Sequence, residues 1–212
     1  MIKHQKELAL SITCFFLAFF CSMIWLKQAE ENLAGHISPG ILRFHVLANS
    51  NSGKDQEVKL KVKGFLLKEL EQSEADSKEE FCQYVTDQKE ALEQEARHYM
   101  ESLGFPYDAR IEVTKRYFPA KAYGDILLPC GTYDTVEVCL GEGRGRNWWC
   151  VLYPRLCFVD ATHAIVPESS KAQLKAILDP EDYEAILDKK ELSVNIRFLS
   201  FELAKNFLST HK

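Results

Sequence analysis

The chain has 212 residues, 46% of them hydrophobic, which is enough for one ordinary domain with its own core and a short appendage. Its formal net charge of -5 excludes the basic footprint of a nucleic-acid-binding protein. The sequence has neither a Walker-type glycine–lysine loop nor a dinucleotide-binding fingerprint, and no cofactor is predicted.

The N-terminus carries an uncharged apolar run, Leu8–Leu26, which follows Lys3 and Lys6 and ends at Lys27. Its nineteen residues, rising about 1.5 Å each in a helix, can just cross the hydrocarbon of a bilayer. The basic start favours a cytoplasmic N-terminus and export of the rest of the chain. The run exceeds a usual signal h-region and no clear Ala-x-Ala site follows, which slightly favours a retained anchor over a cleaved signal peptide.

This pattern predicts a signal peptide or membrane anchor at 1–27, a short polar spacer at 28–40 and an extracytoplasmic domain at 41–212. Beyond the membrane run lie five cysteines, namely Cys82, Cys130, Cys139, Cys150 and Cys157. Outside the cytoplasm disulfides can form, and an odd number leaves at least one thiol free or paired between chains. The cysteine spacings do not match a zinc ribbon or finger, so no metal site is predicted.

Hydrophobic periodicity and turn residues predict alternating strands and helices along the domain. The predicted elements are a strand at Ile41–Ala48, a helix from Ser52 to about Leu70, a second helix between Ser77 and Gly104, strands at Ala109–Phe118 and Thr132–Leu140, a loop at Pro119–Asp125, and helices at Pro167–Leu178 and after Asp179. Residues 193–199 fit a helix and a strand alike. The order predicts a single α/β or α+β domain with a mixed sheet and flanking helices.

Two local features refine this prediction. The first strand is apolar at most positions, which indicates a central strand buried on both faces, with Arg43 and His45 on the same face. Ser52 is the expected N-cap of the helix that follows, with Asp55 three residues on, and Ser77 is expected to cap the second helix in the same way.

The segment Gly141–Asp160 is the most unusual part of the sequence. It opens with three alternate glycines, with Arg144 between the second and the third, followed by Arg146, Asn147, Trp148, Trp149, Cys150 and Cys157. Glycine permits backbone conformations that other residues avoid, and tryptophan carries a large apolar area with one polar group. The segment is either an ordered loop that presents a surface to a partner or a glycine-rich hairpin whose tryptophans fill the core.

Enzyme chemistry has one candidate arrangement. His45 with Asn49 and Ser50 at a strand end resembles part of a hydrolase site, which would need a nucleophile such as Cys150. Cys157 is a plausible disulfide partner for Cys150, and a disulfide has no nucleophilic thiolate. We therefore predict that Cys150 and Cys157 pair, and that His45 is a hydrogen-bonded structural residue.

The tryptophan pair leaves a second function open. With Tyr123 and Tyr153, Trp148 and Trp149 could stack on cell-wall sugars, or they could bind a protein partner. A cell-wall-associated hydrolase or glycan-binding domain is therefore the alternative to a protein-binding role.

Two blocks of the sequence resemble the stage II sporulation protein R family. The first is Arg43–Ser50 with Ser52 and Asp55–Gln56, and the second is Asn147–Pro154 closed by Cys157–Phe158. Tyr123–Asp125 and Gly131–Tyr133 are similar to the family as well, so that the resemblance covers roughly Ile41–Asp160. Arg155 departs from the family pattern, which often has a second proline there, and Cys82, Cys130 and Cys139 look like additions.

The resemblance implies a role in endospore formation. A family member is made in the forespore and exported into the space between the two membranes that surround it. There it activates a membrane-embedded aspartic protease of the mother cell, which processes the sporulation sigma-E precursor. The family member is a signal and not an enzyme, so the resemblance supplies no catalytic residue.

The partner surface is expected mainly at the glycine loop and the tryptophans that follow it. The partner-binding candidates are Arg144, Arg146, Asn147, Trp148, Trp149 and Tyr123, and the candidates for a structural motif are Arg43, His45, Asn49, Ser50, Ser52 and Asp55. At least one tryptophan is predicted to be partly exposed while the other anchors the loop in the core. The helix face around Lys59 and Lys63 is the next candidate for the contact.

Overall fold

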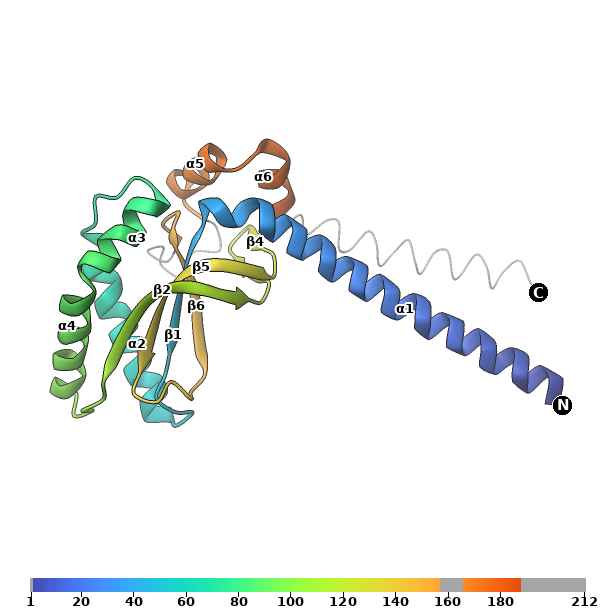
Figure 1. Ribbon diagram of the computed structural model, residues 1–212, viewed down its shortest axis with the longest axis horizontal. Helices are drawn as coiled ribbons and strands as arrows, with labels where there is room; N and C mark the ends of the chain where they lie inside the picture. The colour runs from blue at the N-terminus through green and yellow to red at the C-terminus, as the bar shows by residue number, and fades with distance from the viewer. Residues whose placement is uncertain (1, 157–165, 188–212) are drawn as a thin grey trace.

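A four-stranded mixed sheet forms the centre of the domain in the computed structural model, which describes residues 2–156 and 166–187 (Figure 1). Its strands are β1 (Leu42–Leu47), β2 (Ala109–Phe118), β5 (Gly131–Leu140) and β6 (Asn147–Tyr153). The order is β2-β5-β1-β6, with β1 parallel to β5 and antiparallel to β6, and β2 antiparallel to β5. The prediction of a mixed-sheet α+β domain is confirmed, and β1 is a central strand as expected.

Three helices cover one face of the sheet and form the first core. They are α2 (Gly53–Glu71), α3 (Lys78–Asp87) and α4 (Lys89–Ser102). Ser52 accepts a hydrogen bond from the Asp55 amide at 3.1 Å, which confirms the predicted N-cap of α2. Leu42, Phe44 and Val46 of β1 are buried against the apolar faces of these helices.

The second predicted helix is wrong in one respect, because it is two helices that meet at Gln88. Ser77 caps α3 as predicted. Phe81 and Val85 of α3 and Leu92 of α4 face the same core, so the apolar spacing continues across the break. Thr86 donates its hydroxyl to the Cys82 carbonyl at 2.7 Å, a bond that competes with regular helix geometry near the break.

The other face of the sheet carries the second core. It is covered by the end of α1 (Ile2–Ile37) with α5 (Glu168–Ile177) and α6 (Pro180–Ile186). Both C-terminal helices were predicted. Asp179 precedes α6 without a side-chain cap, whereas the pattern of Asp179 with Pro180 predicts one. The predicted loop at 119–125 contains part of a small hairpin formed by β3 (Lys121–Tyr123) and β4 (Ile126–Leu128). The element expected at 193–199 lies outside the described residues.

The helix α1 extends well past the apolar run and enters the domain. The segment expected to be a polar spacer is helical as far as Ile37, and a short 3₁₀ turn, η1 (Ser38–Gly40), then leads into β1. Ala34 and Ile37 are buried in the second core. A Cβ atom on Gly131 would collide with that of Ala34, so the close approach of α1 to β5 requires glycine.

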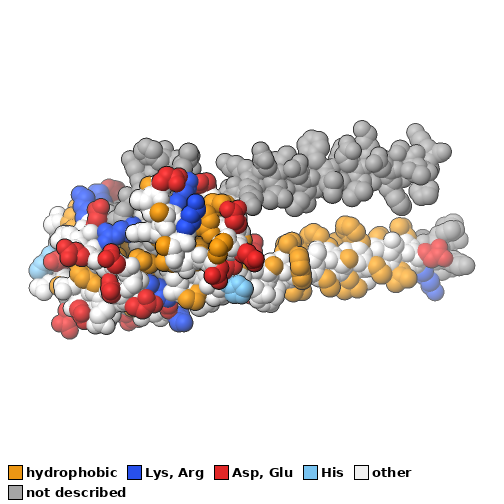
Figure 2. All heavy atoms as spheres, turned by 90° about the horizontal axis from the view of Figure 1, so that it is seen from above, with side chains coloured by type: hydrophobic (Ala, Val, Ile, Leu, Met, Phe, Trp, Pro, Cys, Tyr) orange, Lys and Arg blue, Asp and Glu red, His pale blue; other side chains and the backbone are white. Residues whose placement is uncertain are grey.

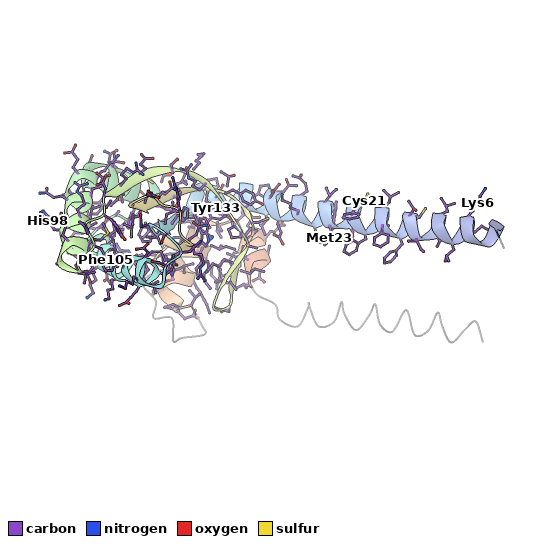
Figure 3. The ribbon with its side chains drawn as sticks, turned by 90° about the horizontal axis from the view of Figure 1, so that it is seen from below. Lys6, Cys21, Met23, His98, Phe105 and Tyr133 are labelled. Carbon is purple, nitrogen blue, oxygen red and sulfur yellow. The ribbon has the colours of Figure 1, made fainter. Side chains whose placement is uncertain are left out.

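The remainder of α1 projects from the domain with its apolar side chains exposed (Figures 1 and 2). By length and composition it could cross a membrane, a test that a signal sequence also passes. Figure 3 shows Tyr133 near the junction of α1 with the domain, whereas His98 and Phe105 lie at the remote end.

Candidate functional site

The glycine segment is a short crossover connection. Residues 141–146 leave β5, pass the end of β1 and enter β6. Because β1 lies between β5 and β6, the segment is not a hairpin, and the hairpin interpretation is wrong in its topology. The two tryptophans belong to β6 and not to a loop. The glycines that precede them favour a loop when the sequence alone is considered.

The chain that follows β1 holds this crossover in place. The amide of Gly145 donates to the Ala48 carbonyl at 2.8 Å, and the amide of Arg144 donates to the Asn49 carbonyl at 3.1 Å. A Cβ atom on Gly141 would collide with the Asn49 side chain, and one on Gly145 would collide with the Ser50 backbone. The glycines are therefore required by the close approach of two backbone segments.

Asp55 organises the holding segment from the first turn of α2. Its carboxylate accepts hydrogen bonds from Asn49 Nδ2 at 3.1 Å, from Ser50 Oγ and from the Tyr107 hydroxyl at 2.9 Å. The bond from Ser50 contributes most to lowering the pKa of Asp55. We call Asn49, Ser50, Ser52 and Asp55 the loop clamp; all four belong to the first sequence block, and their predicted structural role agrees with this geometry.

The two tryptophans lie on opposite faces of β6, and both are half-buried. Trp148 meets Phe44 edge to face, with ring centroids 6.2 Å apart, and Lys63 Nζ lies 4.6 Å from the Trp148 ring. Trp149 stacks on His45 at 3.9 Å. Both tryptophans are thus partly exposed and partly packed, whereas the sequence predicted one exposed and one anchoring tryptophan. Lys63 lies over the Trp148 ring, and His45 stacks on the Trp149 ring.

The glycine loop and the start of β6 lie against the neighbouring face of α2. Arg146 is exposed, and its carbonyl accepts a hydrogen bond from Lys59 Nζ at 2.9 Å. The Arg144 side chain is 79% exposed and pairs with Glu142 at 3.2 Å. We call Arg144, Arg146, Trp148 and Lys63 the loop surface; Asn147 bonds His45 on the other face of β6. The loop surface unites the two regions proposed from the sequence and has an excess of positive charge.

His45 belongs to a hydrogen-bonded row that takes one residue from each strand. Arg116 of β2 binds both carboxylate oxygens of Glu137 in β5, at 2.7 and 2.9 Å. Glu137 lies 3.1 Å from His45 Nδ1, and His45 Nε2 lies 3.1 Å from the Asn147 side chain. Burial lowers the pKa of His45, and its bonds to Asn147 and Glu137 offset this only in part. A neutral His45 held at both nitrogens fits the predicted structural role.

Sequence reasoning missed Glu137 and Arg116. A glutamate between Val136 and Val138, on a face shared with His45 in the neighbouring strand, could have suggested a buried polar pair. Finding it required the register of β1 against β5, which joins residues far apart in the chain.

Arg43 occupies an aromatic cage at the other end of β1. It is fully buried, and its guanidinium lies 4.4 Å from the Phe118 ring centroid and 5.0 Å from that of Tyr133. Nη2 bonds the Tyr123 hydroxyl at 3.4 Å, whereas Nε and Nη1 have no hydrogen-bond partner in the described structure. Burial lowers the pKa of Arg43. Tyr123 therefore contacts Arg43, and among the other partner-binding candidates it is closest in the fold to Trp149, which packs on Phe118 of the same cage with ring centroids 4.6 Å apart.

The cysteines do not form the hydrolase arrangement. Cys150 is opposite Phe44 in the β1–β6 register and faces the first core, whereas His45 is opposite Trp149 on the other face. A dyad of Cys150 and His45 is therefore excluded by the sheet geometry. Cys157 lies outside the described residues, so its pairing with Cys150 stays a prediction. Thiols not in disulfides include those of Cys82, Cys130 and Cys139.

Arg155, where the sequence departs from the family pattern, has a place in the fold. Its guanidinium donates to the carbonyl oxygens of Glu71, at 3.2 Å, and Ser73. These carbonyls lie at the end of α2, where orphan acceptors favour a cationic donor. The arginine thus joins the end of the second sequence block to this helix.

Comparison with known proteins agrees with the two sequence blocks, which lie side by side as the paired strands β1 and β6. The family model described as stage II sporulation protein R matches residues 38–163. Stage II sporulation protein R of Bacillus subtilis (strain 168) is 33% identical over 172 residues, which cover 77% of each chain. No solved structure matches. The family match spans more than half of the chain and includes the loop clamp, the glycine crossover and β6, and the chain therefore belongs to the stage II sporulation protein R family.

Proposed function

We propose that this chain is an exported signalling protein of the forespore that binds and activates a membrane-embedded aspartic protease of the mother cell. That protease processes the sporulation sigma-E precursor. The protein acts from the intermembrane space, with α1 inserted in the forespore membrane or removed by cleavage. It is a ligand and not an enzyme.

The observation that carries this proposal is the meeting of the two family blocks in space. The first block supplies the loop clamp, and the second supplies Trp148 and Trp149 directly after the crossover. A surface fixed by so many hydrogen bonds loses little freedom when it binds, which favours recognition. The clamp and the crossover thus fix the conformation of a candidate contact surface. Cys150 and His45 face opposite sides of the sheet and cannot form a catalytic dyad.

The position of the loop clamp also supports a contact across the intermembrane space. Tyr107, which bonds Asp55 of the clamp, packs against Phe105 with ring centroids 5.8 Å apart. Phe105 lies at the end of the domain remote from α1 (Figure 3). Through Tyr107 the loop clamp is thus joined to the end of the domain that an anchored protein would turn away from its own membrane.

Binding activates a receptor only if the ligand prefers the active state over the inactive one. A tenfold bias corresponds to about 1.4 kcal/mol of differential affinity. Loss of one interface tryptophan typically costs about 2 kcal/mol or more, so a Trp148 contact that forms only with the active state could supply such a bias. The positive loop surface would pair with acidic groups on the outer face of the protease.

The test is reconstitution of the full chain, the candidate protease and the sigma-factor precursor. We expect Trp148→Ala to weaken activation about thirtyfold, the equivalent of about 2 kcal/mol. Lys63→Ala and Arg146→Ala should show smaller losses. Lys61→Ala is the matched control, because Lys61 lies on the same helix but pairs only with Glu57 at 2.8 Å. Parental precursor cleavage by every folded variant would mean that the contact lies elsewhere.

A further inference from the structure

The strand β2 forms one edge of the sheet and pairs only with β5 in the described part of the chain. Two bonds reveal the direction of its backbone groups. The amide of Ile111 donates to the Glu93 carboxylate at 2.8 Å, and the carbonyl of Ala109 accepts from Arg97 at 3.3 Å. These odd-numbered residues therefore turn their backbone groups away from β5.

The pairing of β2 with β5 has no bulge, so the alternation continues along the strand. In an antiparallel ladder, Val113, Lys115 and Tyr117 must then also direct their N–H and C=O groups outward. No backbone group, cap or side chain among the described residues bonds them. The part of β2 beyond Ile111 is thus an open template for another strand.

Two large apolar side chains of this stretch are exposed, alongside the charged residues Glu112, Lys115 and Arg116. Val113 is 39% exposed and Tyr117 is 48% exposed. Elsewhere in the described part of the domain, outside α1, only Leu60 and Leu127 are exposed large apolar residues. Long open edges of this kind invite pairing, and proteins commonly use them to bind extended peptides.

A hollow lies at each end of the open stretch. One, of about 290 Å³, lies between β2 and the α3–α4 junction, where Val85, Thr86 and Lys89 form its wall. The other, of about 370 Å³, lies between Tyr117 and the Glu31–Gly35 turn of α1. A strand added to β2 would have room for alternate side chains in these hollows. The helical wall favours a single peptide strand over the sheet of a second folded domain.

Charge indicates the chemistry of that peptide. The Lys115 side chain is 74% exposed and lies 3.8 Å from Asp134, whose closer partner is Lys78 at 2.8 Å. Lys89 has no ion pair within the described residues. Lys89 lines the first hollow, which Glu112 also borders, and Lys115 lies further along β2, near the Asp134–Lys78 pair. The two lysines would attract an acidic side chain of an added strand.

We propose that the β2 edge binds an extended acidic peptide segment of a partner protein by strand addition. The backbone of Val113, Lys115 and Tyr117 forms the ladder, and a glutamate or aspartate of the segment faces Lys89 and Lys115. This edge is on the opposite side of the sheet from β6, so the site does not rest on the proposed function.

The test uses the full chain in lipid nanodiscs and a synthetic heptapeptide of alternating valine and threonine with a central glutamate. We expect the saturating peptide to slow amide hydrogen exchange at Val113, Lys115 and Tyr117 at least tenfold. The same peptide N-methylated at two adjacent central residues should not do so, because one methyl group blocks the ladder in either register. Equal binding of both peptides would overturn strand addition.

Charge reversal provides the second arm and leaves the backbone of β2 unchanged. Lys89→Glu combined with Lys115→Glu should weaken the glutamate peptide about tenfold and strengthen a peptide with lysine in its place. Lys61→Glu, on the exposed side of α2, is the control and should change neither. Slow amide exchange at the β2 edge in the absence of peptide would overturn the proposal. If it is independent of protein concentration, residues 188–212 cover the edge. If it increases with protein concentration, two copies of the chain pair through it.

Discussion

The two edge strands of the sheet are held in opposite ways. At β6, the clamp fixes the crossover, His45 stacks on Trp149, and Phe44 packs against Trp148. At β2, capping by Glu93 and Arg97 ends after Ile111, and the remaining outward backbone groups are open. One sheet thus combines a preorganised surface, suited to a partner of fixed shape, with an edge that can accept any extended chain of suitable charge.

The largest expected effect comes from forcing the clamped side apart. Gly145→Ala places a Cβ atom against the Ser50 backbone, so the crossover must move. We expect a loss of about 3 kcal/mol in the free energy of unfolding, at the upper end for overpacking. Urea unfolding of the full chain in detergent measures it.

The matched control is Gly64→Ala, because nothing lies within 4 Å of a Cβ atom at Gly64 in α2. Alanine in an open helix interior should raise stability by up to about 1 kcal/mol. Equal effects of the two substitutions would mean that the close approach at Gly145 contributes nothing.

The polar row across the sheet should make stability depend on pH. Because burial lowers the folded-state pKa of His45 below its unfolded value of about 6.5, the unfolded chain binds the proton more readily. The contribution of neutral His45 to the free energy of unfolding is therefore fully present above about pH 6.5. Below that pH it decreases by at most about 1.4 kcal/mol per pH unit. His45→Gln should reduce this slope, as measured by urea midpoints at pH 7.0 and 5.5. Identical slopes would show that His45 titrates alike in both states.

Removing the Glu93 side chain should extend the open edge of β2 to include Ile111. Glu93→Ala leaves the Ile111 amide without its acceptor and should cost about 1 kcal/mol. Amide exchange at Ile111 should become faster, while exchange in β6 should stay unchanged. Unaltered exchange at Ile111 would indicate that another group protects this amide.

The smallest effect on stability is expected on the loop surface. Arg144→Ala removes an exposed pair with Glu142, and such pairs contribute less than about 0.5 kcal/mol. Precursor cleavage, and not the urea midpoint, should respond to this change. A large loss of stability would show that Arg144 helps to hold the crossover.

Local patterns predicted the elements that depend on local causes. The alternation in β2 and β5 and the Ser52 cap of α2 could be read from adjacent residues. The identity of β6 as an edge strand could not, because its partner β1 lies about a hundred residues earlier in the chain. The break between α3 and α4 at Gln88 could not be predicted locally, because the apolar spacing runs through it.

In the candidate site too, features with local causes were predicted and those that depend on distant segments were not. The first block was expected to be structural and forms the clamp, but its contact with Gly145 joins distant segments. Tyr123 was grouped with the tryptophans by residue type, whereas the fold places it beside Arg43. Composition identified which residues are special, and only the register of the sheet showed which of them share a surface.

The continuity of α1 into the second core sets the reach of the protein. Lys27 ends the apolar run and Ala34 is already buried in the domain, seven residues or about 10 Å further along the helix. With α1 anchored as proposed, the domain would stand close to its own bilayer on a stiff stalk. Its far end could then extend toward the opposite membrane only by the length of the domain itself. An anchored molecule would signal only where the two membranes lie close together, whereas a cleaved one could diffuse to receptors across a wider gap.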